Sequence, residues 1–204
     1  MVTLVFVRAP VAGRVKTRLA AALSAEGALL IYRRLAEHAL REARALGGEV
    51  RVHFTPADAC DEVRAWLGEG PCYLPQSTGD LGARMEAAFR AALEEGADRV
   101  VIIGSDLPEL SAALLRRAFA ELESHPAVIG PARDGGYYLL GLRTMIEGLF
   151  DGIPWSTDEV LARTLERLRA AGIEPAVLDT LSDVDEVDDL PAGWAEWARA
   201  EAAR

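Results

Sequence analysis

Short runs of apolar residues alternate along this chain with longer segments in which apolar positions recur every three or four residues. Runs of the first kind are typical of buried strands, and segments of the second kind are typical of amphipathic helices. Strands are predicted at residues 2–7, 50–54, 72–74, 99–103, 127–129, 137–142 and 174–178. Helices are predicted at residues 24–46, 58–67, 80–95, 111–123, 157–171 and 194–203.

The alternation of strands and helices favours βαβ units and a mostly parallel sheet. No segment has the composition of a linker, a repeat or a low-complexity tract, so residues 1–204 are predicted to form a single α/β domain. In such sheets, ligands bind beyond the carboxyl ends of the strands. The segments expected to carry chemistry are therefore residues 8–18, 75–82, 104–109, 130–137 and 180–186.

Composition narrows the range of partners. Half of the residues are apolar, which supplies a sizeable core. The net charge is −10 and the isoelectric point is about 4.9, which argues against nucleic acid or an anionic membrane as a general partner. The chain shows no secretory signal pattern and no apolar run long enough to cross a membrane. Cys60 and Cys72 lack metal-binding spacing, so we expect a cytoplasmic protein.

The acidic balance makes the basic segment at residues 8–18 a local exception. Among the 22 lysines and arginines, Lys16 is the single lysine. The same segment holds three arginines and two turn-forming residues, Arg8, Arg14, Arg18, Pro10 and Gly13. A lysine ammonium is a compact point charge, whereas an arginine guanidinium is a planar fork, so the two bind phosphate differently. The segment is predicted to cradle a polyphosphate; chance retention of one lysine in an arginine-rich chain is the alternative.

Carboxylates follow two of the predicted strands. Asp106 lies just beyond the strand at 99–103, where it could hold a divalent ion against nucleotide phosphates. Asp183 and Asp185 would share one face of an extended segment, so a second metal ligand could come from there. The alternatives are a turn or capping aspartate at 106 and a solvated acidic run near the C-terminus. In the functional interpretation, Lys16 and these carboxylates line one crevice.

The segment at residues 131–138 has two interpretations. Asp134 and Gly135 form a strong turn signal between two strands, which predicts a β-hairpin. Alternatively, Gly135 and Gly136 permit a ligand to approach the backbone closely, with Asp134 and Tyr137 as polar or stacking contacts.

Two further segments precede predicted helices. Gln76 could read a base edge or a ribose, while Asp80 is either an anion-site residue or simply the N-cap of the next helix. Ser156 or Thr157 is expected to cap another helix, and Trp155 is either a core residue or the wall of an acceptor pocket.

Several familiar signatures are absent. The chain has no G-x-G-x-x-G, no G-x-S-x-G and no H-E-x-x-H motif. The residues around Lys16 do not form a Walker loop, because valine stands where glycine should precede the lysine. His38, His53 and His125 are scattered, so a histidine general base is unsupported.

Taken together, the motifs resemble a family of bacterial GT-A-type proteins described as glycosyltransferase-like or radical-SAM/selenodomain-associated transferases, within the nucleotide-diphospho-sugar transferase superfamily. The chain is also similar to the 2-phospho-lactate guanylyltransferases, which carry a comparable Lys-x-Arg-Leu loop and aspartate-proline loop. The motifs that carry the resemblance are Arg8-Ala-Pro-x-x-Gly-x-Val-Lys-Thr-Arg-Leu19, Gly79-Asp-Leu-Gly-x-Arg-Met85, Gly104-Ser-Asp-x-Pro108, Gly130-Pro-x-x-Asp-Gly-Gly-Tyr-Tyr138, Trp155-Ser-Thr157 and Asp183-x-Asp185.

The resemblance implies a GT-A fold, with a central mixed, mostly parallel sheet sandwiched by helices. It also implies a nucleotide held by residues 8–18 and a Mg²⁺ or Mn²⁺ ion near Asp106, with Asp183 or Asp185 completing the metal site. Two departures matter. The D-x-D motif of many glycosyltransferases is absent because Gly104 stands at its first position, and the G-x-G-x-R-M loop of sugar nucleotidyltransferases is absent as well.

The expected function is a metal-dependent transferase acting on a nucleotide-activated substrate, with glycosyl transfer to a small-molecule acceptor as the main hypothesis. Nucleotidyl transfer with release of pyrophosphate is the alternative, and a non-catalytic nucleotide-binding module is a third; no oligomeric state is predicted. Catalytic roles are expected for Lys16, Asp106 and Asp134. Nucleotide-binding roles are expected for Arg8, Pro10, Gly13, Arg14, Lys16, Arg18, Gln76, Asp80 and Ser105. Acceptor-binding roles are expected for Gly135, Gly136, Tyr137, Trp155, Ser156 and Thr157.

Overall fold

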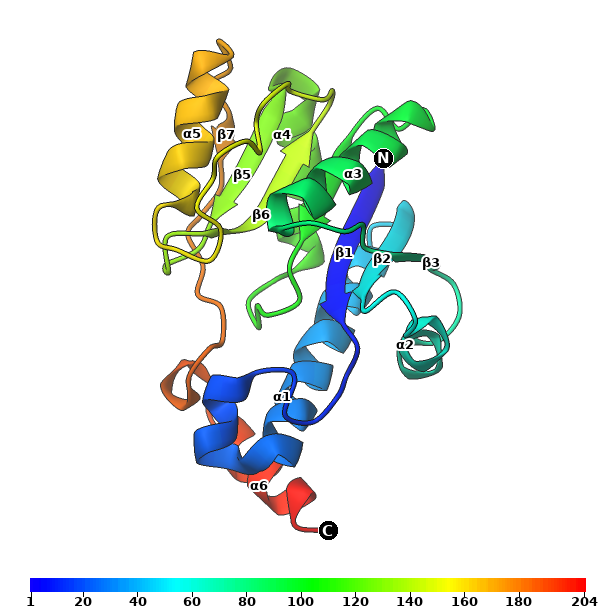
Figure 1. Cartoon of the computed structure of the whole chain (residues 1–204), viewed down its shortest axis with the longest axis vertical. Coiled ribbons are helices and arrows are strands. Elements are labelled where there is room, and N and C mark those ends of the chain that lie inside the picture. The colour runs from blue at the N-terminus through cyan, green and yellow to red at the C-terminus, as the bar shows by residue number, and fades with distance from the viewer.

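A seven-stranded sheet forms the centre of the computed structural model, which describes residues 1–204, and its strand order is β3-β2-β1-β4-β6-β5-β7 (Figure 1). The strands are β1 (Val2–Arg8), β2 (Glu49–Thr55), β3 (Cys72–Pro75), β4 (Val100–Ile103), β5 (Ala127–Pro131), β6 (Tyr137–Leu142) and β7 (Ala176–Val177). The helices are α1 (Thr17–Arg44), α2 (Cys60–Leu67), α3 (Leu81–Glu94), α4 (Ala112–Ser124), α5 (Val160–Ala170) and α6 (Trp194–Ala202), with a 3₁₀ turn η1 at Val187–Asp189.

The sheet is mixed but mostly parallel, as predicted. β1 pairs in parallel with β2 and β4, and β2 pairs in parallel with β3. β6 is the exception, because it runs antiparallel to both β4 and β5. The β5–β6 pair is the predicted hairpin. The mixed, mostly parallel sheet expected from the resemblance is confirmed.

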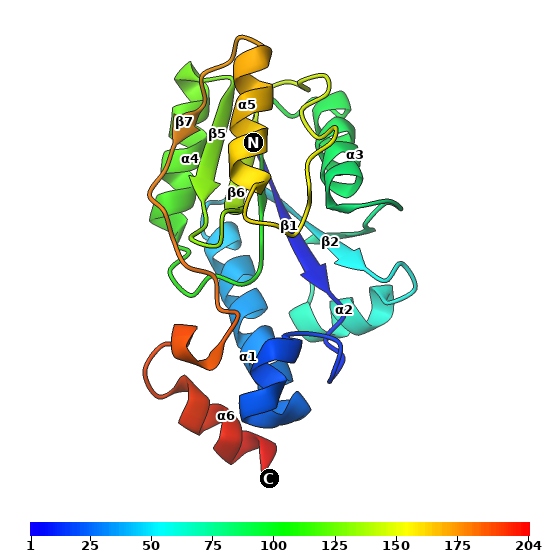
Figure 2. The ribbon, with the colours of Figure 1, turned by 60° about the vertical axis from the view of Figure 1, so that its left-hand side comes forward.

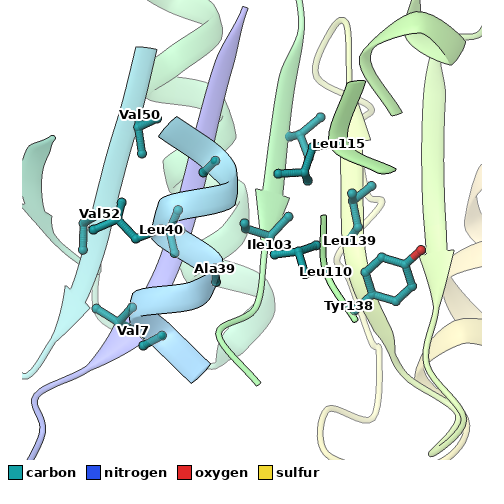
Figure 3. Packing of buried hydrophobic residues seen from close by; sticks show 14 of the residues in the cluster. Val7, Ala39, Leu40, Val50, Val52, Ile103, Leu110, Leu115, Tyr138 and Leu139 are labelled. Atoms are coloured by element: carbon teal, nitrogen blue, oxygen red, sulfur yellow. The ribbon is translucent and has the colours of Figure 1, made fainter. Parts of the chain in front are cut away.

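Helices cover both faces of the sheet. Helices α1, α2 and α4 cover one face, where Leu40, Val52 and Ile103 belong to a cluster of 27 buried residues (Figure 3). Helices α3 and α5 cover the other face, where Phe89 and Leu168 belong to a second cluster of 16 (Figure 2). Strand β4 is buried throughout, which explains its uninterrupted run of β-branched residues.

A small lobe lies beyond the carboxyl ends of the strands. It consists of the first part of α1 packed against α6, as both views show (Figures 1 and 2). Its core is a separate cluster that includes Leu19, Leu23 and Ile31 of α1, Ala198 of α6, and Val184. The segment around Val184 therefore fastens the C-terminal part of the chain to the start of α1.

The largest differences from the predicted elements are at α1, α5 and β7. α1 begins at Thr17, not at residue 24, because a first short helix precedes a kink at Ser24, where φ is 71° and ψ is 168°. α5 begins at Val160, so the prediction of Ser156 or Thr157 as its N-cap was wrong. The strand predicted at 174–178 is reduced to β7, and η1 was not predicted. None of the helices has the length and apolar character needed to span a bilayer.

Candidate active site

The loop after β1 is fixed at its start by Tyr32 and stabilised farther along by a turn of its own. The Tyr32 hydroxyl accepts a hydrogen bond from the Arg8 N–H at 2.7 Å and donates one to the Arg8 carbonyl at 2.9 Å. Burial raises the pKa of Tyr32, so its hydroxyl stays neutral and can serve both roles. Farther along, the Arg14 N–H donates to the Val11 carbonyl, and Gly13 adopts a φ of 76° that the tight turn requires. These contacts give the loop a defined conformation, in which its basic side chains lie at the edge of the sheet.

Lys16 is the centre of this site. Its Nζ lies 3.0 Å from Asp106 Oδ2 and 3.3 Å from Asp185 Oδ1, and it donates to the Val184 carbonyl at 2.5 Å. The Lys16 side chain is only 6% exposed. Its backbone is left-handed, with φ at 46° and ψ at 48°, immediately before the first turn of α1. The lysine and the two distant carboxylates that we expected in one crevice therefore lie in direct contact.

The two carboxylates are positioned by one backbone hydrogen bond and by contacts with neighbouring side chains. The Val184 N–H donates to the Asp106 carbonyl at 3.0 Å, which joins the C-terminal segment to the loop after β4. Arg18 Nη1 lies 3.3 Å from Asp185 Oδ2, although the Arg18 side chain is 71% exposed. The buried Ser105 hydroxyl lies 3.5 Å from Asp106 Oδ1. Each carboxylate thus keeps a defined orientation toward Lys16.

A cavity of about 310 Å³ opens over these residues. Its lining consists of Arg8, Arg14, Val15, Lys16, Thr17, Arg18, Tyr32, Asp106 and Asp185. Four cationic side chains face two carboxylates, so the cavity favours an anionic ligand of phosphate type. A neighbouring cavity of about 520 Å³ shares Arg8 and Arg14 with the first and adds Arg84, Asp58 and Glu62. Because Arg8 and Arg14 line both, the two cavities lie side by side.

The donor atoms around Lys16 fit a divalent cation. Two carboxylates and one backbone carbonyl converge on the ammonium, and Mg²⁺ prefers such oxygen ligands together with phosphate oxygens and water. No three acidic, histidine or cysteine side chains gather closely enough to form a ready-made metal cluster. A metal at this position would therefore have Asp106 and Asp185 as its protein carboxylates.

Asp183 has a different environment from Asp185. It is partly buried, and burial is the main reason why its pKa is raised, with the negative charges of Asp134 and Asp185 adding to the shift. It is not part of the cavity lining. Of the two carboxylates that the sequence left open as metal ligands, Asp185 is the one that reaches Lys16.

Gln76 supports the site indirectly. Its Nε2 donates to the carbonyls of Val7 at 3.2 Å and His53 at 2.9 Å, which ties the ends of β1 and β2 together. Its Oε1 lies 3.5 Å from Arg84 Nη1, and Arg84 also donates to the Gly79 carbonyl. Arg84 is a cavity residue that we did not predict, although it lies in the motif at residues 79–85.

Asp80 and the hairpin residues use their polar groups within the protein. Asp80 caps α3 by accepting from the Ala83 N–H at 2.9 Å, which confirms its predicted capping role. Asp134 Oδ1 accepts from the Gly136 N–H at 2.9 Å within the β5–β6 turn. Gly135 has a φ of 89°, and a Cβ at this residue would collide with the backbone of Asp158. Gly135 therefore permits the close approach of the Asp158 backbone.

The aromatic residues expected at an acceptor pocket are partly buried and pack against the core. Trp155 packs directly over Gly82 of α3 and stacks near Phe150, with 6.5 Å between ring centroids. Tyr137 packs against the same cluster, and burial raises the pKa of its hydroxyl. Neither residue, nor Ser156, nor Thr157, lines either cavity. The acceptor-binding residues predicted from sequence therefore do not meet at Lys16.

Comparisons with known proteins agree with this picture. A family model described as an uncharacterized protein conserved in bacteria (DUF2064) matches residues 39–157. The chain is 32% identical over 186 residues to a 3-phospho-D-glycerate guanylyltransferase from Phenylobacterium zucineum strain HLK1, and the match covers 85% of this chain and 81% of that protein. The resemblance to guanylyltransferases inferred from the motifs is confirmed.

Solved structures extend the comparison. A candidate nucleotide-diphospho-sugar transferase from Desulfovibrio desulfuricans G20 is 33% identical, with a TM-score of 0.88 and coverage of 98% of this chain and 92% of that one. A CMP:2-keto-3-deoxy-manno-octonic acid synthetase complexed with CTP shares the fold at 18% identity, with a TM-score of 0.55 and coverage of 99% and 98%. The expected transferase fold is confirmed.

Proposed function

The chain belongs to the bacterial family DUF2064, and from this premise we propose that it is a nucleotidyltransferase. It would transfer a nucleoside monophosphate from a nucleoside triphosphate to a phosphorylated small molecule, with release of pyrophosphate. This proposal replaces glycosyl transfer, our main hypothesis from sequence, with its alternative. Both reactions require a nucleotide site, and they differ in the bond that breaks.

One observation carries the proposal. Lys16 lies against Asp106 and Asp185 at the base of a cavity that Arg8, Arg14 and Arg18 also line. This concentration of positive charge in an acidic protein suits a triphosphate. The second cavity, of about 520 Å³, lies beside the first and shares Arg8 and Arg14 with it, so it would receive the nucleoside part of the same ligand.

In the proposed reaction, an oxygen of the acceptor's phosphate attacks the α-phosphorus of the triphosphate. The bond from the α-phosphorus to the bridging oxygen breaks, and pyrophosphate leaves with that oxygen. An acceptor phosphate is largely ionised at neutral pH, because its second pKa is about 6. It therefore needs no general base, which agrees with a cavity lining that contains no histidine.

The basic side chains stabilise this reaction electrostatically. Arg8, Arg14 and Lys16 would neutralise the triphosphate and the charge that develops on the leaving pyrophosphate. Arg18, at the exposed rim, is placed to meet an incoming anion. A bound Mg²⁺ or Mn²⁺ would supply further neutralisation of phosphate oxygens, held by Asp106 and Asp185.

The guanylyltransferase relative suggests the substrates to test first. As its name states, that protein transfers a guanylyl group to 3-phospho-D-glycerate. We therefore propose GTP as the nucleotide and a phosphorylated carboxylic acid as the acceptor class. Glycosyl transfer stays as a second candidate, because the similar Desulfovibrio protein is described as a candidate nucleotide-diphospho-sugar transferase.

Product analysis distinguishes the candidates. The protein is incubated with each of the four nucleoside triphosphates, 3-phospho-D-glycerate and Mg²⁺ or Mn²⁺, and pyrophosphate is measured beside a reaction that lacks acceptor. We expect acceptor-dependent pyrophosphate, highest with GTP, and a guanylylated product in the mass spectrum. Nucleoside diphosphate formed from a nucleotide-sugar would instead establish glycosyl transfer, and nucleotide binding without any turnover would indicate a non-catalytic module.

A further inference from the structure

Lys16 occupies the place where a metal ion would bind. Its ammonium contacts Asp106 Oδ2 at 3.0 Å, Asp185 Oδ1 at 3.3 Å and the Val184 carbonyl at 2.5 Å. These three oxygens come from two separate segments of the chain and converge on a single point. They are the oxygen ligands that a hard divalent cation prefers. A cation and this ammonium cannot both sit at the centre of the same oxygen set.

The negative charges of the two carboxylates are already balanced without a metal. Lys16 and Arg18 together carry two positive charges, and Asp106 and Asp185 carry two negative charges. A divalent ion entering alone would raise the local charge by two and would have to compete with a buried ammonium. A triphosphate entering with the ion supplies the negative charge that both Lys16 and the arginines then face.

We propose that Lys16 is a built-in counter-ion that fills the metal position until a nucleotide arrives. The phosphates then draw the ammonium away from Asp106 and Asp185, and these carboxylates become free for the divalent ion. This inference rests on the proposed nucleotide site and adds a binding order to it: the metal binds with the nucleotide or after it. By thermodynamic reciprocity, metal and nucleotide each strengthen the binding of the other.

The local structure allows such an exchange. Val15 and Val184 are both buried, so the backbone on each side of the contact is anchored. The lysine side chain has four rotatable bonds and can therefore move its charge while the backbone stays in place. Lys16, at the start of α1, has a left-handed backbone that is unusual for a residue other than glycine. This conformation directs its side chain toward the Val184 carbonyl.

Manganese binding to the nucleotide-free protein tests the inference without any turnover. Mn²⁺ is titrated into wild-type protein and Lys16→Met, and free Mn²⁺ is followed by electron paramagnetic resonance. Because the substitution removes the competing ammonium, we expect Lys16→Met to bind Mn²⁺ at least about tenfold more tightly than wild type. The double variant Lys16→Met/Asp106→Asn should lose this gain, since it lacks one of the two carboxylates.

Arg18→Met is the matched control. Arg18 also neutralises Asp185, but its guanidinium does not sit among the three oxygens that surround the Lys16 ammonium. Its effect on Mn²⁺ affinity should be clearly smaller than that of Lys16→Met. An equal effect would overturn the inference, since it would reflect general charge. Tight Mn²⁺ binding by wild type, unchanged in Lys16→Met, would overturn it as well.

Two provisions keep the test decisive. If a thermal melt shows that Lys16→Met is unfolded, Lys16→Asn replaces it, because asparagine is uncharged and tolerates a left-handed backbone. The result is also separable from the proposed reaction. If Lys16→Met gains Mn²⁺ affinity but wild type releases no pyrophosphate, the proposed reaction is refuted and the counter-ion role of Lys16 stands. If wild type releases pyrophosphate but Lys16→Met gains no Mn²⁺ affinity, the counter-ion role is refuted and the reaction stands.

Discussion

At the scale of single residues, Lys16 shows why lysine and arginine are not equivalent in this chain. Its ammonium fits among three oxygens within 3.3 Å, in a space that leaves the side chain almost fully buried. A planar guanidinium would need a flatter and wider arrangement of acceptors. The left-handed backbone of such a residue costs about 1–3 kcal/mol, which the ionic contacts with Asp106 and Asp185 offset.

Asp106 is the residue on which turnover should depend most. Asp106→Asn keeps the size of the side chain but removes its charge, so the rate should fall by roughly 10²–10³, as when an enzyme loses one electrostatic stabiliser. The melting temperature should stay close to that of wild type, because the Asp106 side chain is 39% exposed. Asp179→Asn, at an exposed carboxylate paired with Arg117, is the control and should retain activity. Near-wild-type turnover by Asp106→Asn would contradict the role.

The sequence allowed some of these residues to be predicted and not others. Lys16, Asp106 and Asp185 each follow a strand or lie beside the sheet edge where ligands gather, so the topology predicts that they lie near one another. Gln76 and Trp155 were predicted to contact ligands, because from sequence a polar or aromatic residue near that edge can equally contact a ligand or the protein itself. Their partners, two strand-end carbonyls for Gln76 and a helical glycine for Trp155, depend on tertiary packing that no local pattern records.

At the scale of elements, α1 is two helices joined at Ser24. The Ser24 hydroxyl accepts a hydrogen bond from the Gly27 N–H at 3.2 Å, so Ser24 caps the N-terminus of the second helix at the junction. The periodic pattern detected the second helix, which carries most of the apolar positions, and missed the short first one. That first helix is part of the small lobe and begins directly after Lys16, and its buried contacts in the lobe core, rather than helix propensity, stabilise it.

Substitutions at Ser24 should separate the cap from the backbone conformation. With φ at 71° and ψ at 168°, Ser24 lies in a region that suits glycine. Ser24→Ala loses the cap and keeps the unfavourable conformation, so it should lower the free energy of unfolding by about 1 kcal/mol. Ser24→Gly loses the cap but relieves the backbone, so it should be at least as stable as wild type. Urea denaturation measures both, and an alanine variant as stable as the glycine variant would contradict this account.

At the scale of the whole molecule, the active site depends on a contact between distant parts of the chain. Asp185 reaches Lys16 only because Val184 is buried in the core of the small lobe and bonded to the Asp106 backbone. The lobe itself is closed by Arg34, whose guanidinium stacks 4.4 Å from the Trp194 ring and 4.7 Å from the Trp197 ring. The strand and helix pattern predicted the sheet and the crevice at its edge, but the packing of α6 on α1, which holds this segment in place, required the structure.

Weakening the lobe should therefore weaken the nucleotide site from a distance. Trp197→Ala removes half of the Arg34 stack and part of the packing of α6 on α1. Because Trp197 is only partly buried, it should lower the free energy of unfolding by about 2 kcal/mol, less than for a fully buried tryptophan. Nucleotide affinity, measured by calorimetry, should fall about fivefold, since the lobe holds Val184 and Asp185 in place.

Leu168→Ala supplies the control for this last prediction. Leu168 is fully buried under the other face of the sheet, so its truncation should cost about 2–5 kcal/mol, at least as much as Trp197→Ala. It lines neither cavity and touches no part of the lobe core. Its nucleotide affinity should therefore match wild type at a temperature where both variants are folded. If the two variants lose affinity equally, the loss follows from general instability, and the lobe has no specific part in holding the site together.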